Sequence, residues 1–315
     1  MRALSTKDRL DGRKFLPRWR TAWACRGVFL LTTLALTACE PGVLDPQGPV
    51  GRADETILID SLAIMLTIVI PTIVGTLGFA WWYRASNTRA RYLPDWEYSG
   101  RIELIVWSIP ALVIILLGGV IWIGSHELDP AKPLISRARP LEVQAVSLDW
   151  KWLFIYPEFH IASVNELVIP ADVPLHFSLT SASVMNVFFV PQLGSMIYTM
   201  NGMRTQLYLQ ADAPGTFRGQ SSHFSGDGFS DMHFNVRALP ADQFTAWAQQ
   251  THSTGPVLDT GSYAALVKQS VAGTPFTYRD ADPALFQQIV AQIVPPGPGP
   301  EIGHPNPTVS PRTGK

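Results

Sequence analysis

The sequence has little charge of either sign and almost no cysteine. Only 16% of its 315 residues are Asp, Glu, Lys or Arg, whereas an ordinary soluble domain carries about 25%. The 24 basic and 25 acidic residues leave a net charge of −1, so no basic surface is available to neutralise phosphates. We therefore exclude nucleic acid as a partner. The low charge, together with 47% hydrophobic residues, indicates that part of the chain lies in lipid.

The two cysteines, Cys25 and Cys39, both lie near the N-terminus. Basic residues between Arg9 and Arg26 precede the apolar run "GVFLLTTLALTA", which suits a signal peptide and is too short to cross a bilayer. The run ends in "LTAC", which resembles the lipobox of bacterial lipoproteins. That resemblance implies removal of residues 1–38 and lipidation of Cys39, leaving no free thiol and no disulfide. The alternative is a cleaved signal followed by an incidental cysteine.

Two long apolar runs follow residues 39–56, which we expect to lie in the periplasm. The runs at residues 57–84 and 102–126 each reach the roughly 20 residues that cross a bilayer. The connection at residues 85–101 is predicted to be cytoplasmic by the positive-inside rule. In and beside this connection stand Arg84, Arg89, Arg91 and Arg101. Both outer ends of the chain should then lie on the periplasmic side of a bacterial inner membrane.

A β-rich domain is predicted at residues 138–239. Hydrophobic residues there alternate with a period of two, as in "DWKWLFIY", and proline and glycine separate the short runs. This pattern predicts a β-sandwich or small barrel. Beyond it, residues 240–294 contain three short amphipathic stretches that predict helices. The Pro- and Gly-rich residues 295–315 are predicted to be disordered.

The glycine-punctuated stretch "GQSSHFSGDGFSDMHF", residues 219–234, has the composition of a ligand-binding loop. Type 1 and dinuclear copper sites need a thiolate, which the mature chain would lack. A nucleophile is a weak match, because the G-x-S-x-G turn requires glycine where histidine stands. A zinc site is a further alternative, although nothing nearby offers a supporting ligand. Its ligands would be His223, Asp227, Asp231 and His233.

Two spans, followed in order by "DWKW", "VMNVFFVPQLG" and "GQSSHFSGDGFSDM", resemble subunit II of the haem-copper terminal oxidases over nearly the whole chain. The resemblance implies two transmembrane α-helices followed by an all-β cupredoxin-like (Greek-key) barrel or sandwich, with a short helical C-terminal extension. In the cytochrome c oxidases of this family, the barrel holds dinuclear copper A. The copper loop has the pattern G-Q-C-S-E-x-C-G-x-x-H-x-x-M, and another ligand histidine precedes the x-x-V-P-x-L-G stretch.

On that alignment nearly all the copper ligands are replaced. A serine hydroxyl titrates far too high to act as a bridging thiolate, and phenylalanine has no lone pair. We therefore expect no metal and no other cofactor in this chain. The first histidine falls on Asn186, the bridging cysteines on Ser221 and Ser225, the carbonyl-ligating glutamate on His223 and the second histidine on Phe229, while the methionine is kept as Met232.

In lacking these ligands, the chain resembles the quinol oxidases of the cytochrome bo type. It also resembles them in the stretches "FAWWYRASN", "WKWLFIYP", "PGTF" and "SGDGFS". The resemblance implies a non-catalytic structural subunit of a proton-pumping complex that oxidises ubiquinol and reduces oxygen to water. Haems, copper and ubiquinol would then belong to subunit I. Subunits III and IV would be further partners, and membrane lipid would surround the spans.

Two more residues take expected roles from the resemblance. Glu103 matches a family glutamate near the mouth of a proton channel, where a cytoplasmic carboxylate could collect protons; a structural interfacial acid is the alternative. Trp150 matches the family tryptophan that accepts electrons near copper A, and without copper we expect a core aromatic.

Two other functions stay open at this point. The chain could be a copper A electron-transfer subunit of a cytochrome c oxidase, against which the missing thiols speak. It could also be a free-standing membrane lipoprotein, either a binding module or a hydrolase that uses Ser222 and His223.

Overall fold

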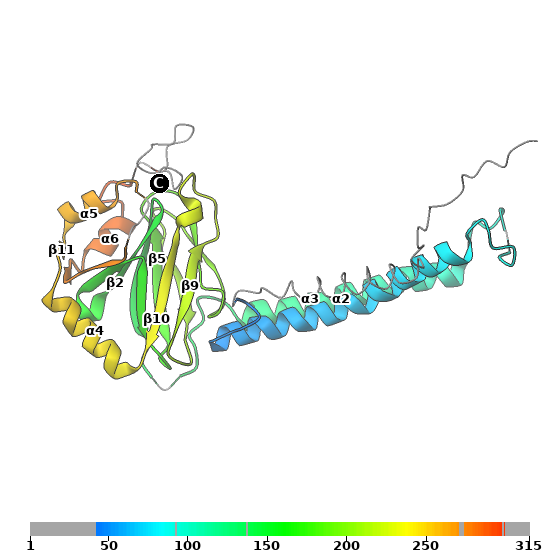
Figure 1. Cartoon of the computed structure of the whole chain (residues 1–315), viewed down its shortest axis with the longest axis horizontal. Helices are drawn as coiled ribbons and strands as arrows, with labels where there is room; N and C mark the ends of the chain where they lie inside the picture. Colours follow the sequence, from blue (N-terminus) through cyan, green and yellow to red (C-terminus); the bar gives the residue numbers. More distant parts are fainter. Residues whose placement is uncertain (1–41, 92, 137, 271–273, 298, 300–315) are drawn as a thin grey trace, which may run out of the picture. The chain divides into compact units, whose positions relative to one another are not determined.

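The computed structural model describes residues 42–91, 93–136, 138–270, 274–297 and 299. Within this range the chain forms two long helices and a β domain to which short helices are added (Figure 1). The predicted signal peptide, Cys39 and nearly all of the predicted disordered tail lie outside the described residues.

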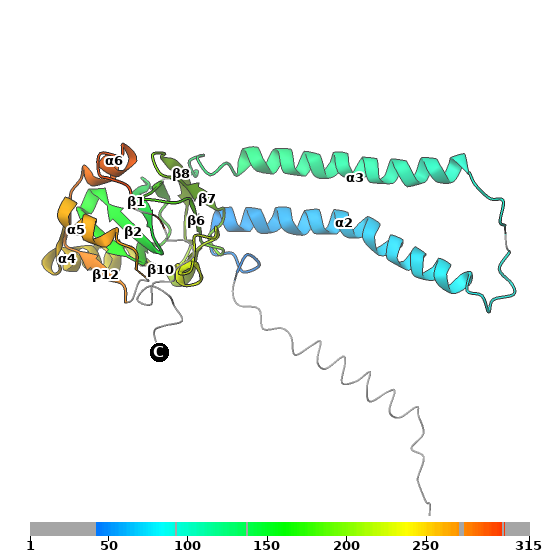
Figure 2. The same cartoon turned by 90° about the horizontal axis from the view of Figure 1, so that it is seen from above.

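The two long helices form a hairpin. Helix α2 (Pro49–Trp82) and helix α3 (Gly100–Glu127) lie side by side in Figures 1 and 2, and both are long and apolar enough to cross a membrane. A Cβ on Gly124 would stand 2.7 Å from Ile57 Cδ1, so glycine allows the close approach near their outer ends. Most other side chains on both helices are exposed within this chain, as expected for surfaces that face lipid or another subunit.

Three threonine hydroxyls within α2 find their acceptors inside the helix. The hydroxyls of Thr67, Thr72 and Thr76 each donate to the carbonyl oxygen four residues earlier, at 3.0, 2.8 and 2.8 Å. A donor without a partner would be costly in hydrocarbon, where no water can replace the missing acceptor. These threonines are therefore compatible with a membrane span.

Helix α2 begins at Pro49 rather than at Ile57, because its first turn packs into the β domain. Proline suits a first helical turn, where its missing N–H would have no helical partner. The amide of Gly51 donates to Leu193 O at 3.0 Å, so the β domain supplies an acceptor that the helix itself cannot. Arg52 forms an ion pair with Asp212. Only the later turns of α2 are thus available to cross the membrane.

The β domain consists of two sheets. The six-stranded sheet has the order β12-β3-β2-β1-β5-β8, and the five-stranded sheet has the order β4-β10-β9-β6-β7. β1 pairs in parallel with β5, and β10 with β4, so connections cross between the sheets. The strands are β1 (Leu141–Leu148), β2 (Lys151–Tyr156), β3 (Ile161–Val164), β4 (Glu166–Pro170), β5 (Leu175–Ser181), β6 (Asn186–Phe189), β7 (Ile197–Thr199), β8 (Thr205–Leu209), β9 (Gly215–Ser221) and β10 (His233–Leu239), with β12 described below.

Aromatic side chains fill the space between the sheets. Trp152 of β2 meets the edge of Phe188 from β6, with ring centroids 5.4 Å apart, and Phe154 lies 5.1 Å from Phe234 of β10. The predicted alternation in β2 is confirmed, because Trp152, Phe154 and Tyr156 belong to this core. The intervening residues of β2 are also buried, against a second core on the opposite face of the sheet.

The C-terminal extension covers that opposite face. Its helix α6 contributes Phe286, which is fully buried in the second core together with Leu153 and Ile155 of β2. Three short strands interrupt the region where the sequence predicts only helices, because β12 pairs with β3 and β11 pairs with β13. The elements are α4 (Ala241–Ser253), β11 (Val257–Leu258), α5 (Thr260–Leu266), β12 (Phe276–Tyr278), β13 (Asp280–Ala281) and α6 (Leu285–Val290).

The start of the predicted disordered tail is held against the β domain. Gly297 N donates to Ala182 O at 2.8 Å, and Gly299 is buried. The predicted fold class, two transmembrane helices followed by a cupredoxin-like β domain with a short helical extension, is confirmed.

Candidate functional site

The positions that align with the copper A ligands, called the emptied copper positions below, lie at one end of the five-stranded sheet. β6 and β9 pair antiparallel with Phe188 opposite Ser221, so Asn186 at the start of β6 comes close to the end of β9. Residues 222–232 then connect β9 to β10 and contain the single 3₁₀ turn η2 (Phe229–Asp231). The sheet register therefore brings together positions that are far apart in the sequence.

The side chains of Asn186 and Ser221 form a hydrogen bond with each other. Both side chains are buried, and the Ser221 hydroxyl donates to Asn186 Oδ1 at 3.1 Å. The network continues inward, since Thr199 Oγ1 donates to Asn186 O at 3.4 Å and lies 2.9 Å from Ser147 Oγ. The first-histidine and first-cysteine positions of the copper pattern thus form one hydrogen-bonded cluster.

The other positions of the copper pattern pack in pairs. Buried Ser225 places its hydroxyl 4.0 Å from the thioether sulfur of buried Met232, a weak acceptor. His223 presents its carbonyl to Ser221 Oγ at 3.4 Å, while its ring meets the edge of Tyr198 at 6.1 Å. Phe229 packs edge-to-face against Phe224 at 5.7 Å. Each position is occupied by ordinary packing or hydrogen bonding.

The residues present do not fit copper A. The two bridging positions carry hydroxyls instead of thiolates, and those hydroxyls already have partners. Among the described residues, no three His, Cys, Asp or Glu side chains are grouped so that they could hold a metal ion. That finding covers the zinc alternative, whose ligands would have been His223, Asp227, Asp231 and His233.

The nucleophile alternative also lacks its geometry. Ser222 is exposed, and its amide donates to Val187 O at 3.3 Å. Its hydroxyl makes no hydrogen bond with His223 in the part of the chain that the structure describes. A nucleophilic serine needs a base within hydrogen-bond reach, so this pair does not form the required arrangement.

Trp150 contacts residues 222–231, the part of the chain that aligns with the copper loop and is called the emptied loop below. Its indole N–H donates to Ser225 O at 2.9 Å, and its ring lies against Gly228, where a Cβ would stand 2.2 Å from the ring. Trp150 is almost fully buried and adopts φ +64° in the turn between β1 and β2. The indole of Trp150 therefore anchors the loop at residues 222–231 at two points.

The neighbouring residues Asp149 and Lys151 form a polar site that the sequence analysis missed. Lys151 Nζ donates to Leu266 O at 2.8 Å, to Lys268 O at 2.7 Å and to Ser270 Oγ at 2.7 Å. Burial lowers the pKa of Lys151 to about 8, against the raising effect of nearby Asp149. Lysine within the apolar run "DWKWLFIY" was the available signal, because lysine is almost never fully buried without partners.

Asp149 is buried beside this lysine. It accepts a hydrogen bond from Ser183 Oγ through Oδ1, while its Oδ2 has no hydrogen-bond partner among the residues that the structure describes. Burial raises the pKa of Asp149, partly opposed by the Ser183 hydrogen bond and by Lys151. The turn Asp149–Lys151 therefore ties three segments to one point: residues 181–185, the emptied loop and the C-terminal extension.

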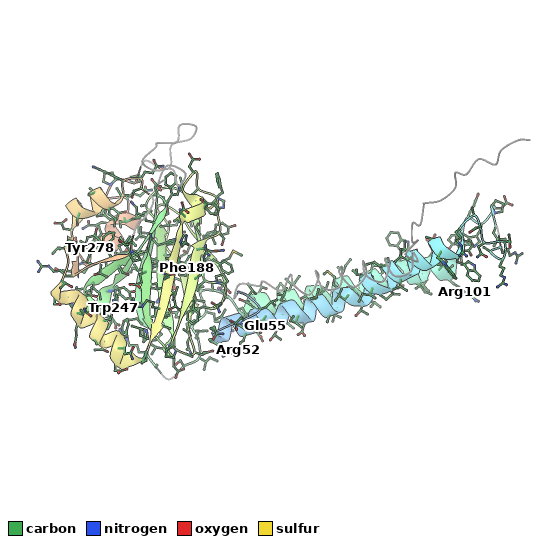
Figure 3. All side chains as sticks on the ribbon, in the orientation of Figure 1. Arg52, Glu55, Arg101, Phe188, Trp247 and Tyr278 are labelled. Carbon is green, nitrogen blue, oxygen red and sulfur yellow. The ribbon has the colours of Figure 1, made fainter. Side chains whose placement is uncertain are left out.

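Glu103 lies in the first turn of α3, at the end of the hairpin away from the β domain. It lines a pocket of about 210 Å³ together with Trp96, Glu97 and Trp107. Arg101 marks the same end of α3 in Figure 3. The Glu103 side chain is exposed to solvent at this end of the hairpin.

Two segments of the chain match known families. Residues 158–239 match the model described as "Cytochrome C oxidase subunit II, periplasmic domain". Residues 252–297, which cover most of the C-terminal extension, match the model described as "COX Aromatic Rich Motif".

Three relatives are similar over most of the chain. Ubiquinol oxidase subunit 2 of Acetobacter aceti is 48% identical over 265 residues, covering 84% of this chain and 86% of that protein. Cytochrome bo(3) ubiquinol oxidase subunit 2 of Pseudomonas aeruginosa is 46% identical over 269 residues, covering 85% and 81%. Quinol oxidase subunit 2 of Bacillus cereus is 36% identical over 243 residues, covering 76% and 84%.

Proposed function

This chain belongs to the ubiquinol oxidase subunit 2 family, and we propose that it serves its oxidase as a non-catalytic structural subunit. It is a subunit of a haem-copper ubiquinol oxidase in the inner membrane, with a periplasmic β domain and other oxidase subunits as partners. Its own part would be to hold subunit I with α2 and α3 and to cover it with the β domain. Subunit I would carry the haems, the copper and the ubiquinol site.

The observation that carries this proposal is the hydrogen bond between Ser221 and Asn186. Two positions that would hold copper in a copper A loop are instead bound to each other inside the β domain. Electrons would therefore have no metal to use there, and a donor dissolved in the membrane would have to deliver them directly to subunit I. Ubiquinol is thus favoured over cytochrome c as the electron donor.

Spectroscopy of the purified complex tests this step. We expect ubiquinol oxidation with haem absorption and without the near-infrared band of copper A. The control is a cytochrome c oxidase measured at the same haem concentration, in which the band must be visible. A near-infrared band from this chain, or rapid turnover on cytochrome c, would refute the proposal.

Glu103 would help protons enter the complex from the cytoplasm. Its position in a small pocket at the cytoplasmic end of α3 supports this role. Glu103→Gln keeps the size of the side chain and removes the exchangeable carboxyl proton, so ubiquinol oxidation should fall severalfold. Asp95→Asn is the matched control, because exposed Asp95 lies in the same connection but does not line the pocket. Equal turnover in both variants would reduce Glu103 to a packing role.

Lipid on Cys39 would add a second attachment to the periplasmic leaflet. The "LTAC" sequence supports this modification, and α2 begins only ten residues later, at Pro49. Mass spectrometry of the mature N-terminus should find a diacylglyceryl thioether on Cys39. A chain that still begins at Met1 would rule out this processing.

A further inference from the structure

A cavity of about 410 Å³ lies where the outer ends of α2 and α3 meet the β domain. Its lining comes from four places: the first turn of α2, the end of α3 with the segment up to Ile135, Ser195, and β8 with the residues that follow it. Neither the emptied copper loop nor the Glu103 pocket shares a residue with it. The cavity therefore needs its own explanation.

Backbone hydrogen bonds fix the walls of this cavity relative to one another. Tyr208 N donates to Pro130 O at 2.9 Å, which joins the segment after α3 to β8. Asp212 N donates to Gln47 O at 2.9 Å, which joins the segment before α2 to the segment after β8. The cavity is thus bounded by bonded backbone segments instead of by free loops.

From the predicted start of the apolar span, we expect the cavity to lie close to the lipid headgroups. The predicted apolar span of α2 begins at Ile57, and Arg52 stands five residues earlier, about 7.5 Å along the helix axis. The polar layer on each side of the hydrocarbon is about 5–7.5 Å thick. Glu127 is the last residue of α3 and lies about one turn after Gly124, which packs against Ile57 of α2. Figure 3 shows Arg52 at this end of α2.

The lining carries both signs of charge. Arg52 pairs with Asp212, yet its side chain remains 55% exposed and can bind a second anion. Lys132 and Glu127 also line the cavity, and neither forms an ion pair within the described ranges. Apolar residues, among them Val50 and Ile135, complete the lining. A wholly anionic ligand would meet acidic side chains here, and a wholly cationic one would meet basic side chains.

We propose that this cavity binds the headgroup of phosphatidylethanolamine, a zwitterionic phospholipid with a primary amine. Its phosphate would contact Arg52 and Lys132, and its ammonium would donate to Glu127 and Asp129. A primary ammonium has three N–H donors for these carboxylates, whereas the quaternary amine of phosphatidylcholine has none. The inference rests on the periplasmic placement of the β domain and is independent of the copper and proton arguments.

Photocrosslinking in the intact oxidase complex tests the site. Ile135, which lines the cavity and is fully exposed, is replaced by p-benzoylphenylalanine. The complex is placed in nanodiscs with equal amounts of phosphatidylethanolamine, phosphatidylcholine and phosphatidylglycerol, and adducts are identified by mass spectrometry. We expect phosphatidylethanolamine adducts to exceed the others by about tenfold, as loss of a charge-assisted hydrogen bond would predict. The same replacement at exposed Phe276 in β12 is the position control.

Charge variants separate a specific site from general contact with lipid. Lys132→Glu and, in a second complex, Glu127→Gln should each reduce that adduct about tenfold while ubiquinol oxidation persists. Lys268→Glu is the matched control, since exposed Lys268 does not line the cavity. Equal labelling of the three lipids, absence of a lipid adduct, or an adduct on another subunit's peptide would each overturn the proposal.

Discussion

Trp150 shows how a single side chain can hold a loop. Its indole N–H and its ring act on different parts of the loop, the carbonyl of Ser225 and the backbone at Gly228. The sequence predicts only a core aromatic at this position. The two contacts give Trp150 a positioning role in addition to burial.

Trp150→Phe should loosen the emptied loop without unfolding the β domain. The ring contact with Gly228 is largely kept, while Ser225 O loses its donor, at an expected cost of about 1 kcal/mol. Hydrogen exchange measured by mass spectrometry should show faster exchange for residues 222–231. Trp247→Phe is the control, because the Trp247 indole packs against Tyr156 without a hydrogen bond in the described part of the chain. Unchanged exchange in Trp150→Phe would contradict the anchoring role.

Lys151 fixes the C-terminal extension to β2 through three hydrogen bonds. Lys151→Met fits the same space but leaves Leu266 O and Lys268 O without this donor. We expect the variant to lose about 2 kcal/mol of stability at neutral pH, since unsatisfied buried carbonyls are costly. Exchange should rise in residues 260–270. Lys268→Met, at an exposed position, should change neither quantity.

The lowered pKa of Lys151 also predicts how stability depends on pH. Between about 8 and 10.5 the unfolded chain keeps a proton on Lys151 that the folded chain has lost, so stability rises with pH in this window. Burial raises the pKa of Tyr156 and Tyr263, and these groups oppose the rise only above about pH 10. Thermal unfolding of the complex between about pH 7 and 9.5 should show the rise in the original protein, and Lys151→Met should lack it.

At the scale of elements, the first turn of α2 is built into the β domain. Gly48 precedes it, and a Cβ there would stand 2.1 Å from Gln210 O, a backbone atom that has no freedom to move away. Gly51 is buried and donates to Leu193 O. The helix and the domain are joined by close backbone contact, for which glycine is required.

Gly48→Ala should therefore weaken the junction between α2 and the β domain. The expected cost is about 1–3 kcal/mol, typical of overpacking against a rigid neighbour. Protease sensitivity near residues 42–52 in the purified complex should increase. Gly261→Ala in α5 is the control, because its added Cβ meets Asp259 Oδ1 at an ordinary 3.5 Å and alanine favours a helix. Similar sensitivity in the two variants would show that the close approach is unimportant.

At the scale of the whole molecule, the chain leaves a large apolar surface on α2 and α3 and a satisfied polar surface on the β domain. The arginines between the helices predict an orientation with the connection in the cytoplasm, which would place the β domain in the periplasm. The exposed apolar surface requires lipid and partner subunits for its burial. The chain is therefore a component of a membrane complex and is incomplete as an isolated protein.

A labelling experiment tests this orientation and the state of Cys39 together. Ser86→Cys, in the connection, should resist a membrane-impermeant maleimide in spheroplasts, and exposed His252→Cys in α4 should react. With residues 1–38 removed as predicted, the original protein would retain only Cys39, and it should not react if lipid occupies that thiol. Labelling at residue 86 in sealed spheroplasts would show that the connection lies on the periplasmic side and would contradict the predicted orientation.

The sequence by itself determined the features that depend on local composition and order. The length of the apolar runs predicted the two spans, and the arginines between them predicted their orientation. A period of two predicted the strands. The residue types at the aligned positions predicted that the copper ligands are missing. Tertiary structure decided what depends on residues distant in the chain: the pairing of Asn186 with Ser221, the indole anchor at Ser225, the start of α2 at Pro49 and the addition of β12 to the sheet. The physical reason is that such contacts follow from strand register and backbone approach, which the folded chain fixes and neighbouring residues do not encode.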